Sequence, residues 1–134
     1  MAYIGNSMSD SMTVNGRAAS ALTDKGGYAV KFNSSGKIAV CASAGEAALG
    51  LLPMQGGTCL SGDEVSVQVS GIGLWKSGAA VSAGALLACD AAGCCRAATA
   101  GQFMLGVALE SASAAGKLIR VQITKSGFVE SADE

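Results

Sequence analysis

The stretch that decides the fold is residues 84–123, GALLACDAAGCCRAATAGQFMLGVALESASAAGKLIRVQI, which repeats the pattern of residues 27–69. Glycine recurs at positions 84, 93, 106 and 116 in the later copy and at positions 27, 36, 50 and 62 in the earlier one. The first interval is nine residues in both, and the copies close on the similar sequences Val67-Gln68-Val69 and Val121-Gln122-Ile123. A doubled pattern of this kind predicts one fold built from two similar halves.

Within each copy, apolar residues alternate with polar or small ones, as in strands that bury one face. In residues 65–69 three valines share one face, while Ser66 and Gln68 share the other, and residues 119–123 repeat this alternation. The segments 33–36 and 90–93 each end in glycine and are typical of turns that connect hairpins. We therefore expect an all-β fold, a compact single-domain β-barrel or sandwich made of two similar halves.

The segments outside the repeat divide the chain further. Residues 1–16 are rich in Ser, Asn, Asp and Met and show no lasting period, so we expect an extended N-terminal arm. Residues 17–127 are expected to form the β domain that contains both copies, and residues 128–134 a C-terminal tail. Residues 71–78 connect the copies and hold the single tryptophan of the sequence, Trp75, which we expect to anchor the core or a subunit interface.

The charge content indicates which partners to expect. Only 14% of residues are charged, against about a quarter in ordinary soluble proteins, and the net charge is −1. There is no basic block for nucleic acid, no apolar run long enough for a spanning helix, and no signal-peptide order at the start. Because a monomer with so few charges risks association, we expect partners or copies of this chain to cover much of the surface. We expect neither nucleic acid nor membrane as a partner.

The sequence contains few of the residues and motifs that catalysis and metal binding commonly use. Histidine is absent, which removes Ser–His and Cys–His nucleophile pairs, and the five cysteines form no C-x-x-C motif. Cys89 and Cys95 align with core-like positions of the first copy and are expected to be buried, whereas Cys94 aligns with Lys37 and is expected to be exposed. We expect no catalytic residue, no metal, no cofactor and no small-molecule substrate.

Two alternative functions remain open. A small β-rich ligand-binding or carrier module of a cellular complex would expose one lysine in a tight hairpin, and Lys37 follows such a turn without a neighbouring methionine. An enzyme would have to use Cys94 or the adjacent carboxylates Asp63 and Glu64. The second copy replaces those carboxylates with Lys117-Leu118, which favours a solvated turn over a catalytic pair.

Three segments together resemble a known family. Residues 62–71 read G-D-x-V-x-V-x-V-x-G, and residues 71–93 read G-x-x-x-W-K-S-G-A-A-V-S-A-G-A-L-L-x-x-D-A-A-G. Residues 97–123 contain G-V-A-L-E, an Ala-rich run and the strand-like L-I-R-V-Q-I. This combination, spanning about residues 26–124, is similar to the small capsid decoration or cement proteins of tailed bacteriophages. The five cysteines and the Ser- and Met-rich arm depart from that family's pattern.

The resemblance implies a β-tulip-like fold and a structural, non-enzymatic protein, made in the host cytoplasm, that forms a homotrimer on the outer capsid surface of the virion. Such proteins stabilise a capsid by bridging subunits of the major capsid protein. An unanchored arm suits strand addition to a neighbour's sheet edge, so the capsid-contact candidates lie there. They are Ala2, Tyr3, Ile4, Met8, Met12 and Thr13. The candidates for contact between subunits are Trp75 and Phe128.

Overall fold

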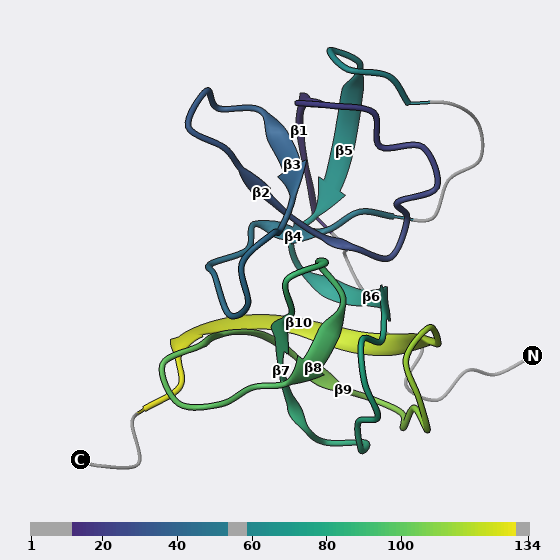
Figure 1. Ribbon diagram of the computed structural model, residues 1–134, viewed down its shortest axis with the longest axis vertical. Helices are drawn as coiled ribbons and strands as arrows, with labels where there is room; N and C mark the ends of the chain where they lie inside the picture. The colour runs from purple at the N-terminus through teal and green to yellow at the C-terminus, as the bar shows by residue number, and fades with distance from the viewer. Residues whose placement is uncertain (1–11, 54–58, 131–134) are drawn as a thin grey trace, which may run out of the picture.

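Ten β-strands arranged in two five-stranded antiparallel sheets make up the computed structural model, which describes residues 12–53 and 59–130. No helix occurs in these two ranges, and so none that could cross a membrane. The two sheets form the upper and lower halves of the molecule in Figure 1. The strands of the first sheet are β1 (Thr13–Arg17), β2 (Ala29–Phe32), β3 (Ile38–Val40), β4 (Gly50–Leu51) and β5 (Glu64–Gln68). Those of the second are β6 (Gly71–Lys76), β7 (Leu86–Cys89), β8 (Cys95–Ala97), β9 (Phe103–Ala108) and β10 (Leu118–Phe128).

The two sheets have the same topology. Their strand orders are β1-β5-β4-β2-β3 and β6-β10-β9-β7-β8, so each strand of the second sheet corresponds to the strand five places earlier in the chain. Each sheet curves until its first and last strands approach through a single parallel bridge, Ala18 to Ile38 in one and Ser77 to Cys95 in the other. Neither sheet closes into a barrel. The expected all-β fold with two similar halves is confirmed, in its sandwich-like form.

Two segments that lie outside the sequence repeat are strands. Residues 71–76, expected to be a connection, form the edge strand β6, which pairs with β10 over six residues. Residues 13–16, expected to belong to the arm, lie in β1 and pair with β5. The repeat of the structure is therefore longer than the repeat of the sequence, because β1 and β6 also correspond. The rest of the expected arm, up to residue 11, and the last four residues of the expected tail lie outside the described residues.

Each sheet packs around an apolar core. The first core is built by residues of the first half: Ala18, Leu22, Val30, Ile38, Leu52, Val65 and Val67. The second is larger and centres on Trp75, Leu87, Leu105 and Val121, but it also takes in Ala29, Cys41, Ala48 and Leu51 from the first half. Each Val, Leu or Ile that is fully buried contributes roughly 1.5–3 kcal/mol. The second core therefore holds the two halves together.

The two hairpin turns of the repeat are fastened in the same way. The Oδ1 atom of Asn33 accepts hydrogen bonds from the backbone N–H groups of Ser35 and Lys37, each at 2.9 Å. The Oδ1 atom of Asp90 accepts the equivalent bonds from Ala92 at 2.8 Å and from Cys94 at 2.9 Å. Short polar side chains commonly hold turns by bonding their own backbone in this way. Two related side chains, an amide and a carboxylate, with the same role at the same place support the pairing of the two copies.

The surroundings of the two turns differ, and this corrects one expectation. Cys89 and Cys95 are buried as expected, but Cys94 is buried as well, with 8% of its surface exposed. The turn that carries it lies against the first half, where the N–H of Ala29 donates to the Gly93 carbonyl at 2.8 Å. Lys37, at the equivalent place in the first half, is exposed. The difference arises because only the second turn is covered by the other half of the molecule.

Candidate interaction surfaces

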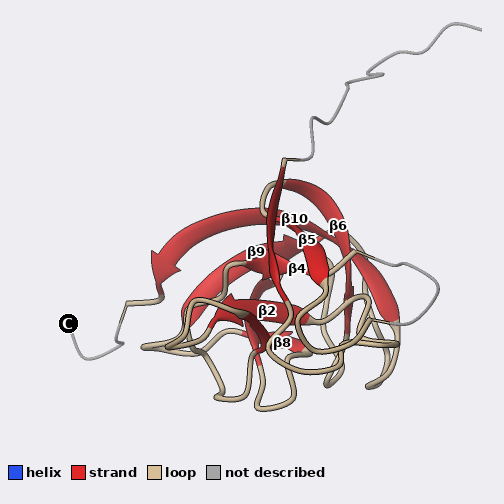
Figure 2. Cartoon of the chain, turned by 90° about the horizontal axis from the view of Figure 1, so that it is seen from above, coloured by secondary structure: helices blue, strands red, loops and turns tan. Residues whose placement is uncertain are grey.

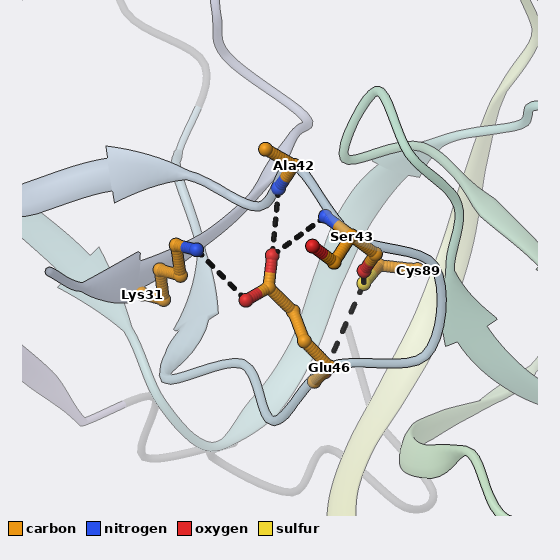
Figure 3. Close-up of polar contacts among 5 residues, drawn as sticks. All are labelled: Lys31, Ala42, Ser43, Glu46 and Cys89. Atoms are coloured by element: carbon orange, nitrogen blue, oxygen red, sulfur yellow. Dashed lines mark hydrogen bonds and ion pairs between the residues drawn. The ribbon is translucent and has the colours of Figure 1, made fainter.

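A polar cluster lies where the two halves meet, in the loop between β3 and β4 (Figure 3). The Glu46 carboxylate accepts hydrogen bonds from Lys31 Nζ at 2.8 Å and from the N–H groups of Ala42 at 2.7 Å and Ser43 at 2.8 Å. The same loop is bound by the second half, because Gly45 donates to the Cys89 carbonyl at 2.8 Å and accepts from the N–H of Phe103 at 3.0 Å. Glu46 therefore shapes a loop that joins the two halves.

These contacts shift the titration of both charged groups. Partial burial of the Glu46 carboxylate disfavours its charged form, but the hydrogen bonds from Lys31, Ser43 and Ala42 outweigh this and hold its pKa below the ordinary value of 4.5. The hydrogen bond to Glu46 raises the pKa of Lys31. The Glu46 carboxylate thus binds two N–H groups of its own loop and the ammonium group of Lys31 in β2, and this fixes the shape of the loop.

Glu46→Gln tests the contribution of this charge. We expect the free energy of unfolding at neutral pH to fall by about 1–2 kcal/mol, because a charged acceptor with three donors is lost at a partly exposed site. A lowered pKa stabilises the folded state above the unfolded pKa, and the stabilisation is lost as the pH falls through the folded value. The difference between wild type and E46Q should therefore be complete above pH 4.5 and shrink below it.

Urea unfolding at several pH values measures this difference. The matched control is E64Q, which removes an exposed carboxylate from β5 and should change stability by less than about 0.5 kcal/mol. A difference for E46Q that persists unchanged in acid would contradict the assigned role of the charge.

Several of the exposed apolar side chains among the described residues lie on the second sheet. We call this group the outer apolar face and define it as Ile72, Leu74, Leu86 and Leu118, all of them exposed. The register places Ile72 and Val107 on either side of Gln122, with Leu86 beyond Val107, so the face crosses β6, β10, β9 and β7. Figure 2 shows that β10 and β6 curve along one side of the molecule, while most loops lie on the opposite side and leave these strands uncovered. Exposed apolar patches of this kind mark surfaces that contact other molecules.

A groove adjoins this face at the end of β10. It has a volume of about 240 Å³ and is lined by Leu86, Met104, Ser126, Gly127, Phe128, Val129 and Glu130. The register of β10 against β9 shifts between Ile123 and Gly127, where Lys125 has a positive φ of 34°. Beyond the shift, Phe128 packs edge-on against Phe103 with ring centroids 5.4 Å apart, and 62% of Phe128 is still exposed. The ring is held in place and remains available for contact.

The edge of the first sheet is a second surface of interest. The N–H of Ala18 donates to the Asp63 carbonyl and the N–H of Val69 donates to the Met12 carbonyl, which places residues 12, 14, 16 and 18 in bonding positions toward β5. Because these positions alternate in an antiparallel pair, the backbone groups of Thr13, Asn15 and Arg17 face away from β5. An edge of this kind is a template for strand addition.

The predicted site residues have different fates. Thr13 is exposed in the edge strand β1, Met12 is exposed directly before it, and Phe128 is exposed beside the groove. Trp75 is wholly buried, and its Nε1–H donates to the Gly93 carbonyl at 2.9 Å, so it belongs to the core and is removed from the interface candidates. Ala2, Tyr3, Ile4 and Met8 lie outside the described residues. The structure does not bring the described candidates together, since Thr13 and Phe128 belong to different sheets.

The residues that an enzyme or a carrier module would use are buried, bonded within a turn, or exposed singly. Asp63 closes its turn by accepting a hydrogen bond from the N–H of Leu60 at 2.9 Å. Cys94 is buried, and Lys37 is exposed at the end of its turn. The outer apolar face was missed, although residues 71–76 carry its signal. Apolar residues occupy both faces of that segment, as in a strand whose outer face is also covered.

Comparison with known proteins agrees with this description. A family model described as phage cement protein matches residues 7–123, which include all of β1 to β9 and the first half of β10. The crystal structure of the head fiber gp8.5 N base in bacteriophage phi29 has a similar fold, with a TM-score of 0.56 and 17% sequence identity. The similarity covers 87% of this chain and 97% of that chain. No curated protein matches. The chain belongs to the phage cement protein family, and it is a structural protein of a phage capsid.

Proposed function

We propose that this protein decorates the outer surface of a phage capsid and stabilises it by bridging subunits of the major capsid protein. The observation that supports bridging most directly is the presence of two unlike contact surfaces in different sheets of one chain. The first is the β1 edge of the first sheet, and the second is the outer apolar face with the groove beside Phe128. A bridging protein needs two such surfaces, because it must hold a capsid subunit with one and a further subunit or a copy of itself with the other.

We assign the capsid contact to the N-terminal segment and the β1 edge. Thr13 and Asn15 turn backbone donors and acceptors outward, and an extended capsid segment can pair with them by strand addition. Met12, with 65% of its surface exposed, supplies an apolar contact at the start of the same edge. The candidates Ala2, Tyr3, Ile4 and Met8 precede this edge in the chain. Backbone pairing needs few charges, which fits a chain with only 14% charged residues.

We assign the contact between copies to the outer apolar face and Phe128. Leu86 and Phe128 line the same groove, and exposed aromatic rings beside pockets are common anchors of interfaces. A homotrimer would present three β1 edges at once, and weak contacts summed over three sites give tight attachment. The role is mechanical: the protein holds subunits in place and requires no chemistry.

A pair of variants tests the two assignments separately. Deletion of residues 1–11 leaves β1 intact, so the oligomer should remain folded. Co-sedimentation with capsids should fall about tenfold, because each copy loses the part of its capsid contact that the N-terminal segment provides. F128S should instead lower the oligomeric state in sedimentation velocity. Its matched control is F32S, which removes an exposed phenylalanine from the first sheet and should leave the oligomer unchanged. Undiminished capsid binding by the deletion variant would exclude the N-terminal segment as the attachment site, and an unchanged oligomer for F128S would exclude the second assignment.

A further inference from the structure

Two buried cysteines from different halves of the molecule meet under the β3–β4 loop. Cys41 directly follows β3, and Cys89 is the last residue of β7. Both belong to the second core, and each has 1% of its surface exposed. The loop that begins directly after Cys41 lies against Cys89, because the N–H of Gly45 donates to the Cys89 carbonyl at 2.8 Å. Cys89 Sγ also lies 3.4 Å from the Ser43 carbonyl oxygen and 3.8 Å from the Glu46 carbonyl oxygen. Figure 3 shows Cys89 beside these two residues of the loop.

The two sulfurs differ in acidity. The hydrogen bond from Cys41 stabilises the thiolate of Cys89 and lowers its pKa, and the same bond raises the pKa of Cys41. Burial raises the pKa of Cys95 to about 12 and also raises the pKa of Cys94. Since the thiolate is the nucleophilic form of cysteine, the lowered pKa favours Cys89 over Cys41, Cys94 and Cys95 as the attacking sulfur.

Only the short β3–β4 loop separates Cys89 from solvent on this side. Ala42, Ser43 and Ala44 are all exposed, and they lie in the loop whose carbonyl groups contact Cys89. These side chains are small, and the loop is held largely by the Glu46 carboxylate and by two backbone bonds from Gly45. A local opening of this loop would admit a small molecule without separating the two sheets.

We propose that Cys41 and Cys89 form an oxidative modification site, at which a peroxide converts the two thiols into a disulfide that links the halves of the protein. The Cys89 thiolate attacks one oxygen of hydrogen peroxide, the O–O bond breaks, and Cys89 becomes a sulfenic acid as hydroxide leaves. The Cys41 sulfur then attacks the Cys89 sulfur, the S–O bond breaks, and the departing hydroxide takes the Cys41 proton. In total, two thiols are oxidised to one disulfide while one peroxide is reduced to two waters.

The disulfide would join the two halves covalently within the second core, to which both halves contribute residues. Cross-linking residues 41 and 89 closes a long loop of the chain, which is the case in which a disulfide restricts the unfolded state most. In a virion component, the pair would stay reduced during assembly in the host and close in oxidising surroundings after release. This timing rests on the proposed function, whereas formation of the disulfide does not.

The test treats the full-length wild-type protein with hydrogen peroxide under native conditions. We expect the intact mass to fall by two hydrogen atoms, two of the five thiols to disappear, and fragment mass spectrometry to find a link between Cys41 and Cys89. The melting temperature should rise by about 5–10 °C and return after reduction with dithiothreitol. Without peroxide, all five thiols should react once the protein is denatured.

Two variants complete the experiment. C89A should remove the mass change and the thermal shift. C95A is the matched control, because Cys95 is equally buried and pairs with Cys89 across β7 and β8, and this variant should keep both effects. Circular dichroism checks that each variant is folded, and the wild-type fragment spectrum stands on its own if one is not. A Cys89–Cys95 link, a stable sulfinic acid on Cys89, or five thiols that survive peroxide would each overturn the proposal.

Discussion

Trp75→Ala is expected to lower the free energy of unfolding by about 3–5 kcal/mol, a large part of the 5–15 kcal/mol that stabilises a typical domain. The Trp75 side chain is wholly buried in the second core, so truncation leaves a cavity among residues that cannot all move in to fill it. Removal of the indole also leaves a buried carbonyl with one donor fewer, because Nε1–H bonds to Gly93 at 2.9 Å.

The effect should reach beyond the second sheet. The Gly93 carbonyl accepts a second hydrogen bond, from the N–H of Ala29 in β2, so Trp75 fixes a turn against which the first half packs. Trp75→Phe is the matched variant: it keeps most of the apolar volume but loses the donor, and it should cost about 1–2 kcal/mol. Circular dichroism in urea is the appropriate measurement, since both variants lack the chain's single tryptophan. A W75A protein within 1 kcal/mol of wild type would contradict the assigned core role.

The sequence predicted the fold well because each half carries its own local signals. The alternation in residues 65–69 and 119–123 identified β5 and β10, where Val65, Val67, Ile119, Val121 and Ile123 are all buried. The turn residues Asn33 and Asp90 stand at the same place in both hairpins and make the same bonds. These features depend on residues close together in the chain, so a pattern along the chain reports them.

The relation between the halves could not be predicted in this way. Cys94 is buried and Trp75 is internal because the second half packs against the first, and that contact joins residues far apart in the sequence. The strand β6 was not predicted because its inward positions include Gly71 and Gly73 while its outward positions include Ile72 and Leu74, so the sequence lacks the alternation of a strand with one buried face. Phe128 was predicted as a contact residue from its aromatic ring alone, and its contact role stays a prediction, whereas the outer apolar face could be recognised only from the register of four strands.

The second large effect is expected at Gly50 and Gly106, which follow Leu49 and Leu105 at equivalent places in the two copies. A methyl group on Gly50 would overlap the Gln68 carbonyl oxygen, and one on Gly106 would lie 2.5 Å from the Gln122 carbonyl oxygen. Neither glycine has a positive φ, so the cost of substitution comes from the close approach of a neighbouring backbone. Because backbone cannot move aside as a flexible side chain can, we expect Gly50→Ala and Gly106→Ala each to cost about 3 kcal/mol or more.

The matched control is Gly36→Ala, which separates crowding from backbone strain. Gly36 has a φ of 76° but open space around its missing side chain, so alanine there should cost only about 1–2 kcal/mol. Gln68 and Gln122 occupy equivalent places in the two copies, and the glycines that face them are equivalent as well. If the two sheets are packed alike, urea unfolding should show similar losses for G50A and G106A, both above that of G36A. Losses no greater than that of G36A would contradict the crowding argument, and a loss at only one of the two glycines would mean that the shared topology does not extend to the packing of its central strands.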